Sequence, residues 1–243
     1  MVSYGETELM SDECIAIITA RGGSTRVPRK NVRPFCGRPM VAWPTRAACV
    51  SGLFSRVIIS TDNEEIAAAA MQEGAERPYV RPPELADAHS TTTQVLRHDL
   101  AEIKSQTGRL PAFCCCLYGT SAMVTPKILT QALDMLRRPD IELVMAVIRY
   151  GHPIERALQF DATGKLRYRQ PEFVPVRTQD IAPSYHDAGL LYFFNVRAFM
   201  EGDGTFLPLT KTAIEVSARE IVDIDTEEDW DMAETLAKQK GLA

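Results

Sequence analysis

The feature that most constrains this fold is an alternation of short apolar segments with amphipathic ones through the first 150 residues. Segments typical of buried strands, rich in β-branched or other apolar residues, lie at 15–19, 56–60, 112–118 and 143–148. Segments with helical signals lie between them, at 40–51, 63–73, 92–107 and 126–138. Such alternation predicts an α/β fold, with a mostly parallel sheet covered by helices on both faces. Sheets of this kind bind ligands beyond the carboxyl ends of their strands.

The pattern changes after Arg149. Short strand-like segments at 157–160 and 166–169, separated by Asp-Ala-Thr-Gly, predict a small antiparallel excursion. Buried-strand character returns at 190–194 and 221–224, and Thr226 with Asp229 has the spacing of a capping box for a last helix at 226–240. We therefore expect one domain over residues 14–243 with an inserted element at about 149–186. The polar, acidic residues 1–13 are expected to be a disordered lead-in and not a secretory signal.

The charge distribution is more informative than its sum. A net charge of −5 argues against a nucleic-acid partner, and no apolar run approaches the roughly 20 residues that span a membrane. One stretch without acidic residues nevertheless carries Arg21, Arg26, Arg29, Lys30, Arg33 and Arg38. A local cationic patch on an acidic protein indicates a small polyanion as the ligand.

The six cysteines do not form a recognisable metal or disulfide pattern. Cys114, Cys115 and Cys116 are consecutive in a predicted strand, no C-x-x-C pair occurs, and no histidine lies near a cysteine at ligand spacing. We expect buried free thiols in a reducing cytoplasm.

The cationic patch begins with a loop at the end of the first predicted strand, Ala20-Arg-Gly-Gly-Ser-Thr-Arg-Val-Pro-Arg-Lys-Asn31. Its two glycines allow a tight bend and bring backbone N–H groups close to an anion, while Ser24 adds a donor. Arg21, Arg26 and Lys30 supply the charge that a triphosphate requires. A solvated turn with unrelated arginines is the alternative. Neither G-x-x-x-x-G-K-[ST] nor G-x-G-x-x-G occurs at this loop, which argues against P-loop ATPases and dinucleotide-dependent oxidoreductases.

An acidic pair lies near the carboxyl terminus. Asp223 and Asp225 flank Ile224 at the end of a predicted strand, where residues i and i+2 point to the same face. Two carboxylates, together with phosphate oxygens and waters, suit Mg²⁺. The alternative is that one of them, or Thr226, only caps the last helix.

The loop resembles the signature loop of the acylneuraminate cytidylyltransferases, the CMP-sialic acid synthetase family. Further segments agree in order and spacing: Gly37-Arg-Pro-Met40, Val57-Ile-Ile-Ser-Thr-Asp62, Arg81-Pro-Pro-Glu-Leu-Ala86 and Asp223-Ile-Asp-Thr-Glu-Glu-Asp-Trp230. The resemblance spans residues 14–237. Within the family, the middle of the chain looks most like the pseudaminic acid cytidylyltransferases, through Gln170-Pro-Glu172, Arg177-Thr-Gln-Asp180 and Tyr185-His-Asp-Ala-Gly189.

The resemblance implies a Rossmann-like nucleotidyltransferase that joins CMP from CTP to a nine-carbon 2-keto sugar acid and releases pyrophosphate. Pseudaminic acid is the expected acceptor, with N-acetylneuraminic and legionaminic acids as alternatives. It implies catalytic roles for Arg21, Lys30 and Asp225, and Mg²⁺, or Mn²⁺ in its place, bound by Asp223 and Asp225. The segment 149–186 resembles the family's dimerisation element, which implies a homodimer whose segment reaches the partner's site.

The resemblance also implies two binding sets. The nucleotide-binding candidates are Ala20, Arg21, Gly22, Gly23, Ser24, Arg26, Lys30, Asn31, Arg81, Thr91 and Thr120. The sugar-binding candidates are Arg177, Gln179, Tyr185, His186 and Asp187. The chain departs from the family pattern at Thr25, which replaces a lysine, at Leu190, which replaces a glutamine, and at residues 118–122, which lack the usual proline. These departures leave open a homologue that binds nucleotide without turnover.

Overall fold

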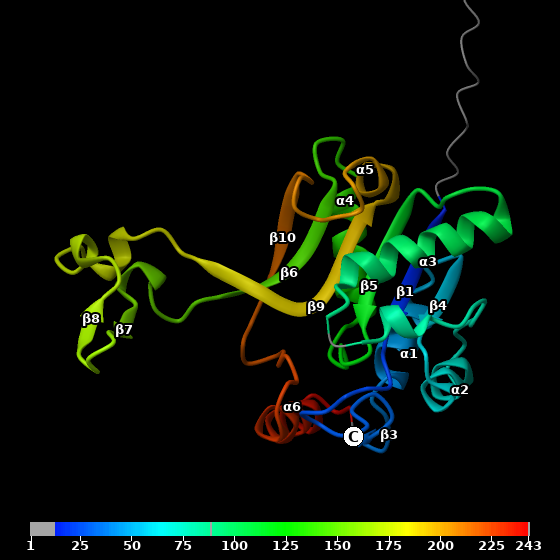
Figure 1. Ribbon diagram of the computed structural model, residues 1–243, viewed down its shortest axis with the longest axis horizontal. Helices are drawn as coiled ribbons and strands as arrows, with labels where there is room; N and C mark the ends of the chain where they lie inside the picture. Colours follow the sequence, from blue (N-terminus) through cyan, green and yellow to red (C-terminus); the bar gives the residue numbers. More distant parts are fainter. Residues whose placement is uncertain (1–12, 88, 243) are drawn as a thin grey trace, which may run out of the picture.

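The computed structural model describes residues 13–87 and 89–242, built around a six-stranded sheet in the order β10-β6-β9-β5-β1-β4 (Figure 1). Its strands are β1 (Cys14–Thr19), β4 (Arg56–Ser60), β5 (Phe113–Tyr118), β6 (Leu143–Arg149), β9 (Tyr185–Asn195) and β10 (Lys211–Val216). Strand β1 runs parallel to β4 and β5, and β10 runs parallel to β6. Strand β9 lies antiparallel between β5 and β6. The expected α/β fold with a mostly parallel sheet is confirmed.

Helices cover both faces of the sheet. They are α1 (Ala42–Ser51), α2 (Glu64–Gln72), α3 (Thr92–Thr107), α4 (Pro126–Leu136), α5 (Val196–Glu201) and α6 (Glu227–Gln239). Successive residues of a strand point to opposite faces, so β1 serves two hydrophobic clusters. Ile15 and Ile17 belong to the cluster that holds the buried residues of α3 and α5, whereas Ala16 and Ile18 join the cluster of α1, α2, α4 and α6.

The three consecutive cysteines follow the same alternation. Cys115 packs into the cluster of α1 and α4, while Cys114 and Cys116 pack into the cluster of α3. All three are fully buried, and all six cysteines are free. Cys36 and Cys49 are only partly buried, so the expectation of burial is wrong for these two.

The predicted helix boundaries agree closely with the structure because local capping determines them. Thr125 caps α4 and Pro126 occupies its first turn, as predicted. Thr226 and Asp229 form the expected capping box at the start of α6. Before α1, the strands β2 (Pro34–Phe35) and β3 (Arg38–Pro39) form a short hairpin.

The strand predicted at 221–224 is wrong. The partner of β6 at the sheet edge is instead β10, a strand not predicted from the sequence, and residues 221–224 are an irregular connection to α6. Ile221 and Ile224 are nevertheless buried in the cluster of α1 and α4. An apolar pattern reports burial, and it does not distinguish a buried strand from buried irregular backbone.

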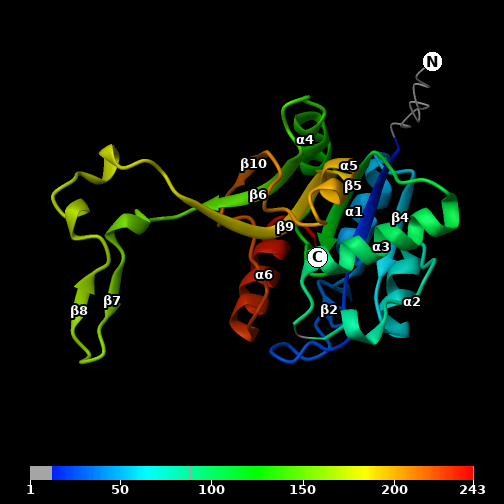
Figure 2. The same ribbon diagram turned by 45° about the horizontal axis from the view of Figure 1, so that its top comes forward.

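The antiparallel excursion forms an arm. Strands β7 (Leu158–Phe160) and β8 (Leu166–Tyr168) pair as a hairpin, and both views show the arm projecting away from the sheet (Figure 2). Short 3-10 helices η2 (Ile154–Arg156), η3 (Pro171–Phe173) and η4 (Thr178–Asp180) complete the arm, and η1 (Pro83–Leu85) lies elsewhere. The predicted disordered lead-in falls, except for Glu13, outside the described residues. In the part of the chain that the structure describes, every helix is too short or too polar to cross a membrane.

Candidate active site

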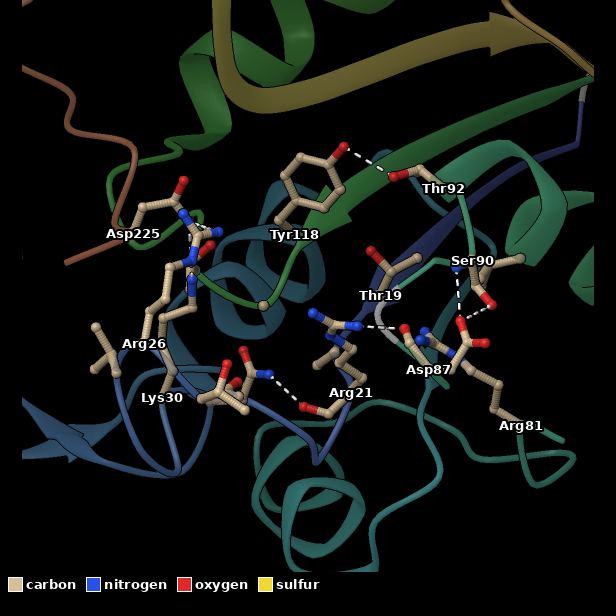
Figure 3. A pocket seen from close by; sticks show the side chains of 18 of the residues that line it. Thr19, Arg21, Arg26, Lys30, Arg81, Asp87, Ser90, Thr92, Tyr118 and Asp225 are labelled. Carbon is tan, nitrogen blue, oxygen red and sulfur yellow. Dashed lines mark hydrogen bonds and ion pairs between the residues drawn. The ribbon is translucent and has the colours of Figure 1, made fainter. Parts of the chain in front are cut away.

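A pocket of about 420 Å³ opens where β1 and β5 end at their carboxyl edges, as expected for this fold (Figure 3). This volume is in the range of sites that bind small molecules. The residues singled out from the sequence that line it are Ala20, Arg21, Ser24, Thr25, Arg26, Lys30, Asn31, Arg81, Thr120, Asp223 and Asp225. The predicted cationic loop and the acidic pair therefore share one cavity.

The loop is anchored by polar contacts from its backbone. Asn31 is buried and donates from Nδ2 to the Arg21 carbonyl at 2.9 Å. The Gly22 N–H donates to Asp62 Oδ1 at 2.9 Å, which gives Asp62 an anchoring role while Asn63 caps α2. The contact with Asp62 holds the start of the loop at the end of β4, and the contact of Asn31 with Arg21 joins the two ends of the loop.

The left-handed residue of the loop is an arginine and not one of its two glycines. Neither Gly22 nor Gly23 adopts a positive φ, and Arg29 takes a left-handed conformation instead. A Cβ at Gly22 would lie 3.1 Å from the Asn63 side chain, whereas Gly23 faces open space. Neither glycine is part of the pocket wall formed by the described residues.

Gly119 is a position that sequence reasoning underrated. A Cβ there would lie 2.5 Å from Asn31 Oδ1 and 2.8 Å from the Ala20 Cβ. Glycine is therefore required for the end of β5 to approach the loop. A glycine directly after a buried strand is the signal that could have identified it.

Packing of α6 brings the acidic pair to the loop. Phe35 contacts Trp230 edge to face at 5.5 Å between ring centroids. The Arg33 guanidinium lies 4.4 Å from the Trp230 ring centroid and 2.6 Å from Glu227 Oε2. Lys30 Nζ then donates to the Ile224 carbonyl at 2.5 Å. Segments almost 200 residues apart in sequence thus form one wall of the pocket.

Opposite charges alternate on this wall. Asp225 Oδ1 lies 2.8 Å from Arg26 Nη2 and 3.6 Å from Lys30 Nζ. Burial lowers the pKa of Lys30, while Asp225 and Asp223 oppose that effect. Asp223 keeps contact with solvent, yet partial desolvation raises its pKa and the neighbouring Asp225 raises it further. Two carboxylates that repel one another favour a cation between them.

The chemistry of this donor set fits Mg²⁺. Within residues 13–87 and 89–242, no group of three or more His, Cys, Asp or Glu side chains is arranged to hold a metal. Mg²⁺ is commonly bound through one or two carboxylates together with substrate phosphates and waters. Asp223 and Asp225, beside a cationic loop suited to phosphate, match that requirement.

Arg81 is buried in the pocket wall and is not a surface arginine. Its Nε donates to Ser60 Oγ at 3.1 Å and its Nη2 to the Ser60 carbonyl at 2.5 Å. Burial lowers the pKa of Arg81, and the charge of the nearby Asp99 carboxylate opposes this effect. Asp99 is itself fully buried, and among the described residues neither carboxylate oxygen has a hydrogen-bond partner.

The opposite wall includes residues outside the predicted set. Arg21 Nη1 donates to the Asp87 carbonyl, and Ser90, Thr92 and Tyr118 also line the pocket (Figure 3). Thr91, which was predicted to bind nucleotide, lies outside the pocket wall formed by the described residues. Its hydroxyl caps α3, because the N–H of the third helical residue needs an acceptor there.

The five predicted sugar-binding residues do not line this pocket in the described part of the chain. Arg177 and Gln179 lie on the arm, where Arg177 pairs with Asp180 at 2.7 Å. Tyr185 and His186 begin β9 at the base of the arm. Asp187 lies closer to the acidic pair, since its charge contributes to the raised pKa of Asp223. Within one chain, the arm residues Arg177 and Gln179 are thus not part of the nucleotide pocket, whereas Asp187 lies near its acidic pair.

Comparisons with known proteins agree with this geometry. The family described as cytidylyltransferase matches residues 15–240. The chain is 34% identical over 225 residues to a pseudaminic acid cytidylyltransferase of Campylobacter jejuni, covering 92% of this chain and 96% of the relative. It is 31% identical to N-acylneuraminate cytidylyltransferase A of Danio rerio, covering 90% of this chain and 49% of that one.

A solved structure shares the fold. It is a CMP:2-keto-3-deoxy-manno-octonic acid synthetase complexed with CTP, with a TM-score of 0.67 and 17% identity, covering 94% of this chain and 99% of the other. At that identity the likeness concerns the fold alone. With the family match over residues 15–240 and the 34% identity to a full-length relative, this chain belongs to the cytidylyltransferase family.

Proposed function

We propose that this cytidylyltransferase joins CMP from CTP to pseudaminic acid, a nine-carbon 2-keto sugar acid, and releases pyrophosphate. One observation carries the proposal. A cationic loop and an acidic pair almost 200 residues apart line the same pocket, in a chain 34% identical to a pseudaminic acid cytidylyltransferase over 92% of its length. N-acetylneuraminic and legionaminic acids are the alternative acceptors, the latter because a Legionella pneumophila CMP-N,N'-diacetyllegionaminic acid synthase is 28% identical.

The reaction forms one bond and breaks another. The anomeric hydroxyl of the sugar acid attacks the α-phosphorus of CTP, and the bond to the bridging oxygen breaks, so that pyrophosphate leaves with the electron pair. Arg21, Ser24 and Lys30 line the pocket and are our candidates for holding the triphosphate and the departing pyrophosphate. Lys30 is partly withdrawn from water, which strengthens its attraction to phosphate. Positioning of two charged substrates is the main task of such a site.

Asp223 and Asp225 are our candidates for binding Mg²⁺, or Mn²⁺ in its place. When bound, the ion would neutralise phosphate charge and lower the pKa of the attacking hydroxyl. Asp225 Oδ1 lies 2.8 Å from Arg26 Nη2 and 3.6 Å from Lys30 Nζ, and these ion pairs hold the carboxylate at the pocket wall.

The proposal includes a homodimer in which the arm serves the partner's site. Arg177 and Gln179 lie on the arm and not at the pocket of their own chain. The arm also exposes apolar side chains, with Phe160 exposed by 74% and Leu166 by 53%. Exposed apolar clusters of this kind are typical of interaction surfaces. We also infer a cytoplasmic enzyme of surface glycan biosynthesis, since free thiols suit a reducing compartment.

The activity is tested by pyrophosphate release from CTP and Mg²⁺ with each of the three sugar acids. We expect the highest kcat/KM with pseudaminic acid. Asp225→Asn should lose about a hundredfold or more of the activity, while Asp231→Asn, an exposed aspartate of the same region on α6, should retain it. Mn²⁺ binding followed by electron paramagnetic resonance should weaken in Asp225→Asn. CTP binding without pyrophosphate release for any acid would favour the non-catalytic homologue instead.

The dimer is tested by mixing two inactive variants. Arg177→Ala impairs the arm and Asp225→Asn impairs the nucleotide pocket of its own chain. If the arm completes the partner's site, statistical exchange of subunits restores up to about a quarter of the wild-type sites. Two inactive variants that remain inactive after exchange, or a monomer by light scattering at micromolar concentration, would contradict the proposed assembly.

A further inference from the structure

Strand β9 contains a bulge next to the candidate site. Its pairing with β6 shifts register between Met145, which faces Tyr192, and Val147, which faces Asp187. Two steps along β6 therefore correspond to five along β9, and Gly189 within the bulge has a φ of +60°. Bulges of this kind redirect side chains and occur preferentially beside active sites.

The bulge folds Asp187 back onto its own strand. Tyr192 donates from its hydroxyl to Asp187 Oδ2 at 2.5 Å, and the Gly189 N–H donates to Oδ1 at 2.9 Å. Both carboxylate oxygens are thereby fixed. A Cβ at Gly189 would lie 3.0 Å from the Asp223 carboxylate, so the bulge packs directly against the acidic pair.

A chain of hydroxyls continues from Tyr192 into the nucleotide pocket. Tyr118 donates from its hydroxyl to the Tyr192 oxygen over a longer contact of 3.4 Å, and Thr92 Oγ1 lies 2.9 Å from the Tyr118 hydroxyl (Figure 3). Thr92 and Tyr118 line the pocket, whereas Asp187 does not. These hydrogen bonds thus connect Asp187, a sugar-binding candidate, to Thr92 in the nucleotide pocket.

The Asp187 carboxylate, at one end of this row of hydroxyl groups, determines which group donates in each hydrogen bond. An ionised carboxylate only accepts hydrogen bonds, so Tyr192 uses its single proton on Asp187. Tyr192 then accepts from Tyr118, and Tyr118 accepts from Thr92. The Thr92 hydroxyl therefore gives its proton to Tyr118, and Thr92 itself lines the nucleotide pocket.

We propose that Tyr192 is a positioning residue for the transfer reaction, because its hydroxyl fixes Asp187 beside the acidic pair and, through Tyr118, holds the Thr92 hydroxyl in place at the wall of the nucleotide pocket. The inference rests on the proposed function, since it assigns Asp187 to the acceptor sugar and Thr92 to the nucleotide. The Tyr192 ring is buried, stacks on Phe206 at 5.3 Å and meets Tyr118 edge to face at 5.6 Å. Tyr192→Phe keeps this packing and removes only the hydroxyl.

The test is a double-mutant cycle between Tyr192→Phe and Asp187→Asn. Tyr192→Phe should raise the acceptor KM about tenfold, the effect of losing a hydrogen bond to a charged group, with a smaller change in kcat. In the Asp187→Asn background the same substitution should change the acceptor KM less than about twofold, because the two residues act as one unit. Additive effects, or an unchanged acceptor KM in Tyr192→Phe, would overturn the proposal. Thermal unfolding checks that each variant remains folded.

Tyr118→Phe is the matched comparison, since it leaves the bond between Tyr192 and Asp187 intact. It should leave the acceptor KM within about twofold, while both tyrosine variants raise the CTP dissociation constant by roughly two- to fivefold in calorimetry without acceptor. If the wild-type enzyme released no pyrophosphate with any sugar acid, the proposed function would fail. Calorimetry with CTP would still test whether the Tyr192 hydroxyl acts on the nucleotide pocket. An unchanged CTP dissociation constant in Tyr192→Phe would refute that role of Tyr192.

Discussion

Asp99 offers a perturbation whose size follows from the structure. It lies on α3 beneath the pocket, fully buried, and neither carboxylate oxygen has a hydrogen-bond partner among the described residues. Burial raises its pKa from an ordinary value of 3.8 to about 6, although the positive charge of the nearby Arg81 guanidinium opposes the shift. In the folded protein Asp99 therefore keeps its proton up to about pH 6, whereas in the unfolded chain it loses the proton near pH 3.8.

The sign of the stability change follows from proton linkage. Between pH 4 and 6 the folded state binds more protons at this site than the unfolded state, so stability falls as the pH rises. The extra stability is fully present below about pH 4 and is lost above about pH 6. A shift of roughly two units corresponds to a loss of about 3 kcal/mol across this window.

The measurement is the difference in unfolding free energy between wild type and Asp99→Asn, which cannot ionise. Urea unfolding at fixed ionic strength, followed by tryptophan fluorescence from pH 4 to 8, provides it. We expect wild type to lose about 3 kcal/mol relative to Asp99→Asn between pH 4 and 7, with no further change above that. The exposed Asp231→Asn is the control for the removal of a surface carboxylate. Parallel curves for wild type and Asp99→Asn would refute the reasoning.

Three further substitutions test the site and its support. Gly189→Ala introduces a Cβ 3.0 Å from the Asp223 carboxylate at a φ of +60°. We expect it to lower the unfolding free energy by about 1–2 kcal/mol and pyrophosphate release about tenfold or more; full activity would contradict the close packing. Thr25→Lys adds a cation to the pocket wall and should tighten CTP binding roughly fivefold in calorimetry; unchanged affinity would show that Thr25 is no deficit. Thr226→Ala removes the α6 cap and should cost about 1 kcal/mol in urea unfolding, and no loss would mean that Asp229 alone holds this end.

The agreement between sequence and structure is greatest where local rules suffice. The predicted strand at 56–60 and the helix at 92–107 coincide with β4 and α3, because periodicity and caps identify both within a few residues. The acidic pair is a partial success. Asp223 and Asp225 meet the loop as expected, but from irregular backbone rather than from a strand. Packing of Trp230 against Phe35 brings them there.

Other parts of the site depend on contacts that no local pattern contains. The choice of Thr92 over Thr91 for the pocket depends on which hydroxyl the helix uses as its cap. The hydrogen bond between Tyr118 and Tyr192 joins residues 74 positions apart in adjacent strands. The sequence places Arg177 in the excursion at 149–186, but it does not show that this segment projects away from the sheet as an arm.

The sequence by itself determined the alternating strands and helices, their caps and the cationic loop, because each rests on side chains within one turn or one strand. It also determined the family resemblance, which rests on the order and spacing of short segments along the chain. Only the tertiary structure decided that β10 and not residues 221–224 completes the sheet, that Gly119 admits the loop, and that a bulge in β9 brings Asp187 to Tyr192. These outcomes depend on packing between distant segments. Burial makes such contacts favourable, and an apolar sequence pattern predicts that a residue is buried but not which residue it packs against.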